Sequence, residues 1–128
     1  MNPLLSEAIK TRLQAHAPYS KFMVGAAIRD DQGQIYGGCN VENASYGATI
    51  CAERTAVVRM VGQSGARKIT EVVVVTDGAS GHTPCGICRQ VLTEFSADPK
   101  KTLVHIANTQ KILKTFTLED LLPESFKL

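Results

Sequence analysis

Four consecutive valines, Val72 to Val75, constrain the fold of this chain more than any other stretch. An uninterrupted β-branched run of this kind is typical of a strand that is covered on both faces. Such a strand lies in the middle of a sheet, and the segments around it must supply helices for both faces. The sequence therefore predicts an α/β fold built around this strand.

Helical periodicity and turn residues predict the elements around that strand. An amphipathic first helix is expected to begin at Asn2-Pro3, to bury the face of Leu5, Ile9 and Leu13, and to end before Pro18. Further strands are expected at residues 22–29, 34–40, 102–107 and 111–116, and further helices are expected to begin with caps at Thr49, Thr83 and Thr117.

This order of elements decides the architecture. An opening hairpin is followed by crossovers in which a helix joins two strands, and such crossovers favour a mixed sheet with helices on both faces. We therefore expect a three-layer α-β-α fold with a mixed five-stranded sheet. A chain of 128 residues is long enough for one core, so residues 1–128 are expected to form a single domain. The helix after Thr49 is mostly apolar and is expected to be buried.

Two short segments place thiols at the expected starts of the second and third helices. One is Cys51-Ala52-Glu53-Arg54, and the other is Cys85-Gly86-Ile87-Cys88. A Cys-x-x-Cys pair at the start of a helix brings both sulfurs to one point, and Cys51 supplies a third thiolate. Three protein ligands and one water are the coordination of a catalytic zinc, so we expect Zn²⁺ on Cys51, Cys85 and Cys88.

Charged residues beside the thiols fit this hypothesis. Glu53 is badly placed to be a fourth ligand but well placed to face a water on the metal. Three thiolates leave Zn²⁺ with a net charge of about −1, which nearby cations can offset. Arg54 and Arg89 each directly follow a site residue. We expect these two arginines to compensate the charge, with Arg54 the stronger candidate.

Composition argues against several other classes of protein. No apolar run is long enough to span a membrane. A net charge of +2 with no block of lysines and arginines gives no support to a nucleic-acid partner. The chain shows no secretory signal, so we expect a cytoplasmic location, in which its four cysteines are metal ligands or free thiols before they are disulfides.

Four segments resemble the small, homotetrameric class of cytidine deaminase: Phe22–Ala27, Gly38–Tyr46, Cys51–Arg54 and Pro84–Leu92. The similarity extends from about Pro18 to Phe126, and three cysteines with a non-ligand glutamate match the zinc deaminase signature. The resemblance implies a cytidine deaminase-like fold. It also implies hydrolytic deamination of cytidine or deoxycytidine to uridine or deoxyuridine and ammonia, a reaction of pyrimidine salvage. In this reaction Glu53 would deprotonate a zinc-bound water and pass the proton to the base and the departing amine.

The same resemblance implies roles for residues outside the metal segments. Phe22 falls at the wall of the family's nucleoside pocket, and Asn40 and Glu42 fall where the family holds the ribose hydroxyls. Phe126 matches a C-terminal aromatic residue that packs at a neighbouring subunit's site in the homotetramer. Tyr46 is a weaker candidate for a contact between subunits. The expected partners are therefore a pyrimidine nucleoside and three further copies of the chain.

Several alternatives remain open at this level. Related deaminases of modified nucleosides, of nucleoside antibiotics or of bases within RNA or DNA share the two metal segments. A fourth thiol, Cys39, could complete an all-cysteine structural zinc site, or the thiols could form a redox module. Among the histidines only His82 lies near the metal segments, and we expect it to be an ordinary loop residue. His105 is expected on a strand face.

Overall fold

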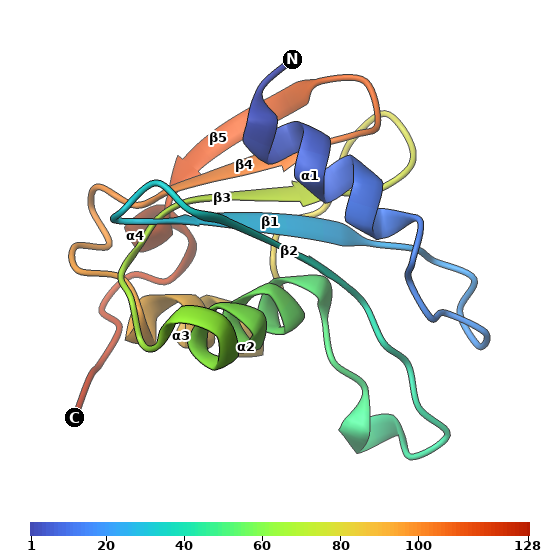
Figure 1. Ribbon diagram of the computed structural model, residues 1–128, viewed down its shortest axis with the longest axis horizontal. Coiled ribbons are helices and arrows are strands. Elements are labelled where there is room, and N and C mark those ends of the chain that lie inside the picture. The colour runs from blue at the N-terminus through green and yellow to red at the C-terminus, as the bar shows by residue number, and fades with distance from the viewer.

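A mixed five-stranded sheet in the order β2-β1-β3-β4-β5 forms the middle layer of the computed structural model, which describes residues Met1–Leu128. Figure 1 shows the sheet between α1 on one face and α2 with α3 on the other. The prediction of three layers and five strands is confirmed. The elements are α1 (Pro3–Arg12), β1 (Gly25–Asp30), β2 (Ile35–Cys39), a 3₁₀ turn (Tyr46–Ala48), α2 (Ala52–Ser64), β3 (Ile69–Val75), α3 (Gly86–Glu94), β4 (Leu103–Ala107), β5 (Ile112–Thr117) and α4 (Leu118–Leu121).

Strand β3 is central, as the valine run predicts. It pairs antiparallel with β1 and parallel with β4, and Val72 to Val75 are all buried. The β3–β4 pair is the parallel one, and α3 supplies the crossover that a parallel connection requires. The loop between β3 and α3 therefore leaves the carboxyl end of the central strand.

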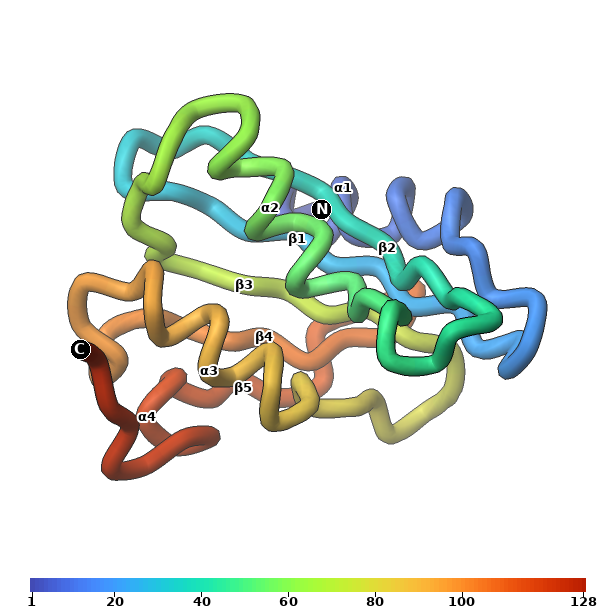
Figure 2. The backbone as a smooth tube through the Cα atoms, turned by 90° about the horizontal axis from the view of Figure 1, so that it is seen from below, coloured from blue at the N-terminus to red at the C-terminus, as the bar shows by residue number.

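The two faces of the sheet bury separate clusters of apolar side chains. On one face α1 places Leu4, Leu5 and Ala8 against Val73 and Val75 of β3. On the other face α2 and α3 lie side by side, as Figure 2 shows, over a core of thirteen buried residues. The central strand is thus covered on both sides, which is why its sequence shows no alternation between apolar and polar residues.

The buried face of α1 differs from the predicted one. The helix ends at Arg12, so Leu13 lies beyond its last turn and is 66% exposed. The residues that α1 buries are Leu4, Leu5, Ala8 and Arg12. Arg12 is held there because its Nε donates to the carbonyl oxygen of Met23 at 3.1 Å.

The predicted helix caps at Thr49 and Thr83 are wrong, and an isolated β-bridge explains the first of them. Val41 and Ile50 exchange backbone hydrogen bonds at 2.9 Å, so the chain stays extended past Thr49 and α2 has Cys51 as its N-cap. Likewise α3 has Cys85 as its N-cap, which leaves Thr83 and Pro84 before the helix. The capping box at Thr117 and Asp120 is confirmed.

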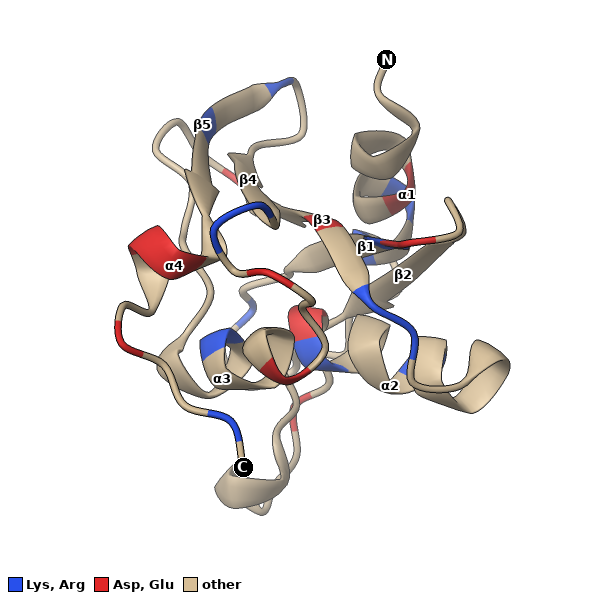
Figure 3. Cartoon of the chain, turned by 90° about the vertical axis from the view of Figure 1, so that its left-hand side faces the viewer, with Lys and Arg blue, Asp and Glu red and all other residues tan.

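The surface of the molecule is mixed in character. In the view of Figure 3 acidic and basic residues are interspersed among the elements. The prediction that α2 is buried is wrong for its outer side, where Val58 and Val61 are exposed. None of the helices has both the length and the apolar character needed to cross a membrane.

Candidate metal and nucleoside site

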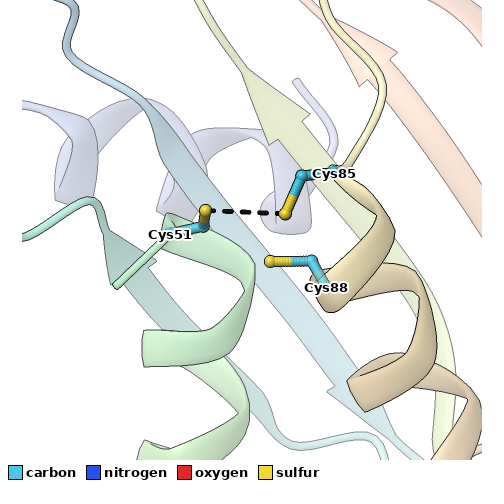
Figure 4. A group of neighbouring side chains, drawn as sticks. All are labelled: Cys51, Cys85 and Cys88. Carbon is cyan, nitrogen blue, oxygen red and sulfur yellow. Dashed lines mark hydrogen bonds between the residues drawn. The ribbon is translucent and has the colours of Figure 1, made fainter. Parts of the chain in front are cut away.

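The starts of α2 and α3 bring three thiols together. Cys51 and Cys85 are the N-cap residues of these helices, and neither side chain caps its helix. Cys88 follows in the first turn of α3. The Sγ atoms of Cys51 and Cys85 are 3.7 Å apart, and all three sulfurs lie within 4.8 Å of one another. Figure 4 shows the three sulfurs pointing toward one another.

This arrangement fits a zinc ion. Sulfurs at about 2.3 Å from a tetrahedral zinc lie about 3.8 Å from one another, close to the separation between Cys51 and Cys85. Thiolates are also the soft ligands that zinc accepts readily. Cys88 is buried and Cys85 is exposed, so one side of the group faces the protein and the other faces a cavity. The three cysteines could therefore hold zinc and leave a fourth position open.

The fourth cysteine lies outside this group. Cys39 ends β2, is half-buried, and is not among the residues whose sulfurs converge. Burial raises the pKa of the Cys39 thiol, which favours its neutral form. The geometry therefore gives no support to a closed, all-cysteine structural site.

Hydrogen bonds stabilise negative charge on Cys51. Hydrogen bonding to Cys88, followed by hydrogen bonds from Arg54 and Cys85, lowers the pKa of Cys51 to about 5 despite partial burial. The Nη2 atom of Arg54 is 3.7 Å from this sulfur and also donates to the carbonyl oxygen of Thr49 at 3.2 Å. Arg54 thus lies where a charge compensator has to lie, next to a thiolate.

Arg89 does not play the part that its sequence position suggests. Its Nε donates to the carbonyl oxygen of Pro84 at 2.7 Å, and its Nη2 donates to Thr83 Oγ1 at 3.0 Å. A third bond, at 2.6 Å, runs from Nη1 to the carbonyl oxygen of Leu121, the last residue of α4. The expectation that Arg89 compensates the thiolates is therefore wrong. Its guanidinium ties the loop before Cys85 to α4.

Glu53 is the second residue of α2 and is 4% exposed. Burial, with a smaller contribution from the negative charge of Cys51, raises the pKa of this carboxyl to about 7. A carboxyl group with this pKa accepts and releases protons near neutral pH. Glu53 lines the same cavity as Cys51 and Cys85. The structure therefore places a buried carboxyl group with a raised pKa beside the converging thiols.

The cavity has a volume of about 280 Å³, close to the lower end of small-molecule pockets. Phe22, Asn40 and Glu42 line it together with Cys51 and Cys85, so the structure brings these sequence-predicted residues into one site. Phe126 is not among the lining residues and is 65% exposed. Its carbonyl oxygen accepts a hydrogen bond from Gln90 of α3 at 3.3 Å.

Asn40 and Glu42 fix the wall of the cavity by hydrogen bonds. Asn40 accepts from the backbone N–H of Val24 at 2.9 Å and donates to the carbonyl oxygen of Phe22 at 2.8 Å. Glu42 accepts from the backbone N–H groups of Tyr19 and Ser20 at 2.9 and 3.1 Å and from the hydroxyl of Ser20. The Ser20 hydroxyl is the main reason why the pKa of Glu42 is lowered. Both side chains keep hydrogen-bonding capacity for a ligand.

Sequence reasoning missed several residues that line the site, among them the polar residues Ser20, Thr76 and His82. Ser20 lies in the irregular segment before β1, and Thr76 directly follows β3. His82 lies in the glycine-rich loop before α3, and its position three residues before Cys85 was the one available signal. Sequence position alone does not show where the His82 side chain points, because contacts with residues distant in sequence set the conformation of such a loop.

Comparison with known proteins supports this description. The family model for the cytidine and deoxycytidylate deaminase zinc-binding region matches residues 2–105, a range that contains all three thiols. A cytidine deaminase from Halalkalibacterium halodurans is 43% identical over 123 residues, covering 96% of this chain and 91% of that protein. The crystal structure of cytidine deaminase from Burkholderia pseudomallei has a TM-score of 0.87 at 41% identity, covering 96% of both chains. The structure from Mycobacterium tuberculosis has a TM-score of 0.84 at 38% identity, covering 99% and 97%.

Proposed function

The chain belongs to the cytidine and deoxycytidylate deaminase zinc-binding family, and we propose that it is a cytidine deaminase that hydrolyses cytidine and deoxycytidine to uridine and deoxyuridine. One observation carries this conclusion above all. Two of the three converging thiols, Cys51 and Cys85, line one cavity together with the buried carboxyl of Glu53, so a metal site and a proton carrier would face the same bound molecule. In the reaction one water is consumed and one ammonia is released.

Cys51, Cys85 and Cys88 would hold the zinc. When bound, zinc supplies the Lewis acidity that makes water nucleophilic at neutral pH. Arg54 offsets part of the negative charge of the three thiolates through its contact with Cys51. This compensation matters because an anionic ligand set weakens the acidifying power of the metal.

Glu53 moves the proton. Its carboxylate accepts a proton from the attacking water and transfers it to ring nitrogen 3 of the base, which makes the neighbouring carbon electrophilic. In the breakdown of the tetrahedral species Glu53 takes the remaining proton from the hydroxyl group on that carbon and passes it to the departing amine, which leaves as ammonia while the carbonyl of the product forms. A group that performs both transfers needs a pKa near the working pH, and the raised pKa of Glu53 supports this role.

The rest of the cavity positions the nucleoside. The Phe22 ring forms a wall for the base, and Asn40 and Glu42 bind the ribose hydroxyls with the hydrogen-bonding capacity that they keep. A sugar held at one end places the base between Phe22 and the thiol group. Positioning of this kind supplies a substantial part of the rate acceleration of an enzyme.

The working form that we propose is a cytoplasmic homotetramer that acts in pyrimidine salvage, with residues 1–128 as one domain in each subunit. Large apolar side chains on the surface support assembly, since Tyr46, Val58, Ile87 and Phe126 are all exposed in the single chain. In this assembly Phe126 packs at the site of a neighbouring subunit. Light scattering that reports a fully active monomer would contradict the assembly.

The direct test is turnover by the zinc-loaded chain. Cytidine, deoxycytidine and free cytosine are offered in parallel, and the loss of ultraviolet absorbance is followed together with ammonia release. We expect both nucleosides to be deaminated and free cytosine to react poorly, because the base alone lacks the sugar that Asn40 and Glu42 bind. A zinc-loaded chain that releases no ammonia from either nucleoside would overturn the proposed function.

A further inference from the structure

The backbone of Phe22 is anchored by hydrogen bonds, but its side chain is loosely held. Its N–H donates to the hydroxyl of Ser20 at 3.0 Å, and its carbonyl oxygen accepts from Asn40. The ring itself is 40% exposed and belongs to neither apolar core. Because a ring in this situation can change its χ angles, something else has to fix its orientation in the cavity.

The residue that faces this ring is His82. The ring centroids of Phe22 and His82 are 5.0 Å apart with an interplanar angle of 72°, an edge-to-face pair. This is a preferred geometry for two aromatic rings. Both side chains line the cavity that contains Cys51 and Glu53. The two rings therefore form one part of the cavity wall.

His82 is fixed by the sheet, although its own loop is exposed. Its Nδ1 lies 3.2 Å from the Oγ1 of Thr76, a residue that is 1% exposed and follows directly on β3. Gly81, the residue before it, has a φ of +68° and lies so close to β4 that a Cβ there would be 2.5 Å from Ile106 Cγ2. The imidazole is thus held from the sheet through Thr76 and through the packing of Gly81.

We propose that His82 is a positioning residue for nucleoside binding, which holds the Phe22 ring in place through the edge-to-face contact while Thr76 holds the imidazole. This inference rests on the proposed function, since it takes the cavity to be the nucleoside pocket. His82 acts on the substrate through Phe22 and not as a proton carrier. No catalytic step in the proposed reaction requires its ring nitrogens.

A double-mutant cycle measures this coupling. We expect His82→Ala to raise KM for cytidine by about tenfold, the upper part of the range for an aromatic pair, and to leave kcat within about twofold. In a Phe22→Leu background the same change should alter KM by less than about twofold, because the contact is already lost. Equal effects of His82→Ala in the two backgrounds would overturn the proposal.

Rescue by a second ring separates positioning from acid-base chemistry. His82→Phe keeps an aromatic edge against Phe22 but has no ring nitrogen, so it should keep KM within about threefold of the wild-type value. A collapse of kcat in this variant would contradict the proposal, because it would give His82 a catalytic role. Ser80→Ala, an exposed residue of the same loop, is the matched control and should change neither constant.

A spectroscopic readout keeps this inference distinct from the proposed function. The chain contains four phenylalanines, so 4-fluorophenylalanine labelling gives a simple ¹⁹F spectrum in which Phe22→Leu assigns the Phe22 signal. We expect His82→Ala to shift and broaden this signal and to leave the zinc content unchanged. An unchanged signal would overturn the positioning role even if cytidine is turned over. A shifted signal in a chain that fails to deaminate nucleosides would sustain the contact and defeat only the proposed function.

Discussion

Replacing Gly38 by alanine tests whether the spacing between β2 and α2 is what places the site. Gly38 lies in β2 directly beneath the start of α2. A Cβ at this position would be 2.4 Å from both the carbonyl oxygen of Ala52 and the backbone nitrogen of Ala56. Both atoms belong to the helix backbone, so no side-chain rotation relieves the clash. The helix that carries Cys51 and Glu53 has to move.

The size of the effect follows from these distances. Ordinary van der Waals contact needs a displacement of α2 by about 1 Å. Overpacking costs about 1–3 kcal/mol, and a clash with rigid backbone belongs at the upper end, so we expect about 3 kcal/mol of lost stability and a fall of about 10 °C in Tm. A misplacement of about 1 Å at a reacting group costs about a hundredfold in rate, so kcat/KM should fall by about that factor.

Thermal unfolding followed by circular dichroism measures the stability, and zinc content and cytidine turnover measure the site. Gly62→Ala is the matched control because Gly62 is exposed in the same helix and has nothing within 4 Å of an added Cβ. It should raise stability by about 0.5 kcal/mol through the better helix propensity of alanine. A Gly38→Ala variant with wild-type Tm and turnover would refute the claim that this close approach positions α2.

Further predictions concern a buried carboxylate and the thiols. Burial opposes ionisation of Asp30, but hydrogen bonds from Arg67, Gln34, Tyr36 and Gln32 outweigh it and lower its pKa. Its stabilising contribution is therefore complete above about pH 5 and is lost as the pH falls through the lowered pKa. We expect Asp30→Asn to cost about 3 kcal/mol at pH 7 and to flatten the acid limb of a urea unfolding series, whereas an unaltered acid limb would count against this assignment. Metal analysis of single alanine variants should show loss of zinc when Cys51, Cys85 or Cys88 is replaced. Cys39→Ala should retain its full zinc content, and loss of zinc from any other set of three cysteines would disprove the ligand set.

The sequence predicts the layers of this fold well because the strongest signals are local. The run Val72 to Val75 can only be satisfied by burial on both faces, and the structure places it in the central strand. Helix starts are predicted less accurately. Thr49 has the chemistry of an N-cap, but the pairing of Val41 with Ile50 keeps the chain extended until Cys51. That pairing joins Ile50 to Val41, which lies well before the cap pattern in sequence, so the cap pattern alone could not reveal it.

In the site, too, local sequence signals predict some features and contacts between distant residues decide the others. The three thiols and Glu53 follow from spacing within helices, and their convergence requires only that α2 and α3 lie side by side. Arg54 and Arg89 each directly follow a site residue in sequence, yet Arg54 contacts Cys51 whereas Arg89 is bound to Leu121, the last residue of α4. The sequence indicates only an ordinary loop residue at His82. Its contacts with Phe22 and Thr76 cannot be predicted locally, because the fold of the whole chain brings these residues together.

Glu53→Gln tests the central claim most directly, since glutamine keeps the shape of the side chain but cannot carry the proton. The measurement is the rate of ammonia release from cytidine together with the zinc content of the same sample. We predict an unchanged zinc content and a rate lower by about a thousandfold, within the range for loss of a general acid-base group. A variant that retains zinc and deaminates cytidine at close to the wild-type rate would contradict the account.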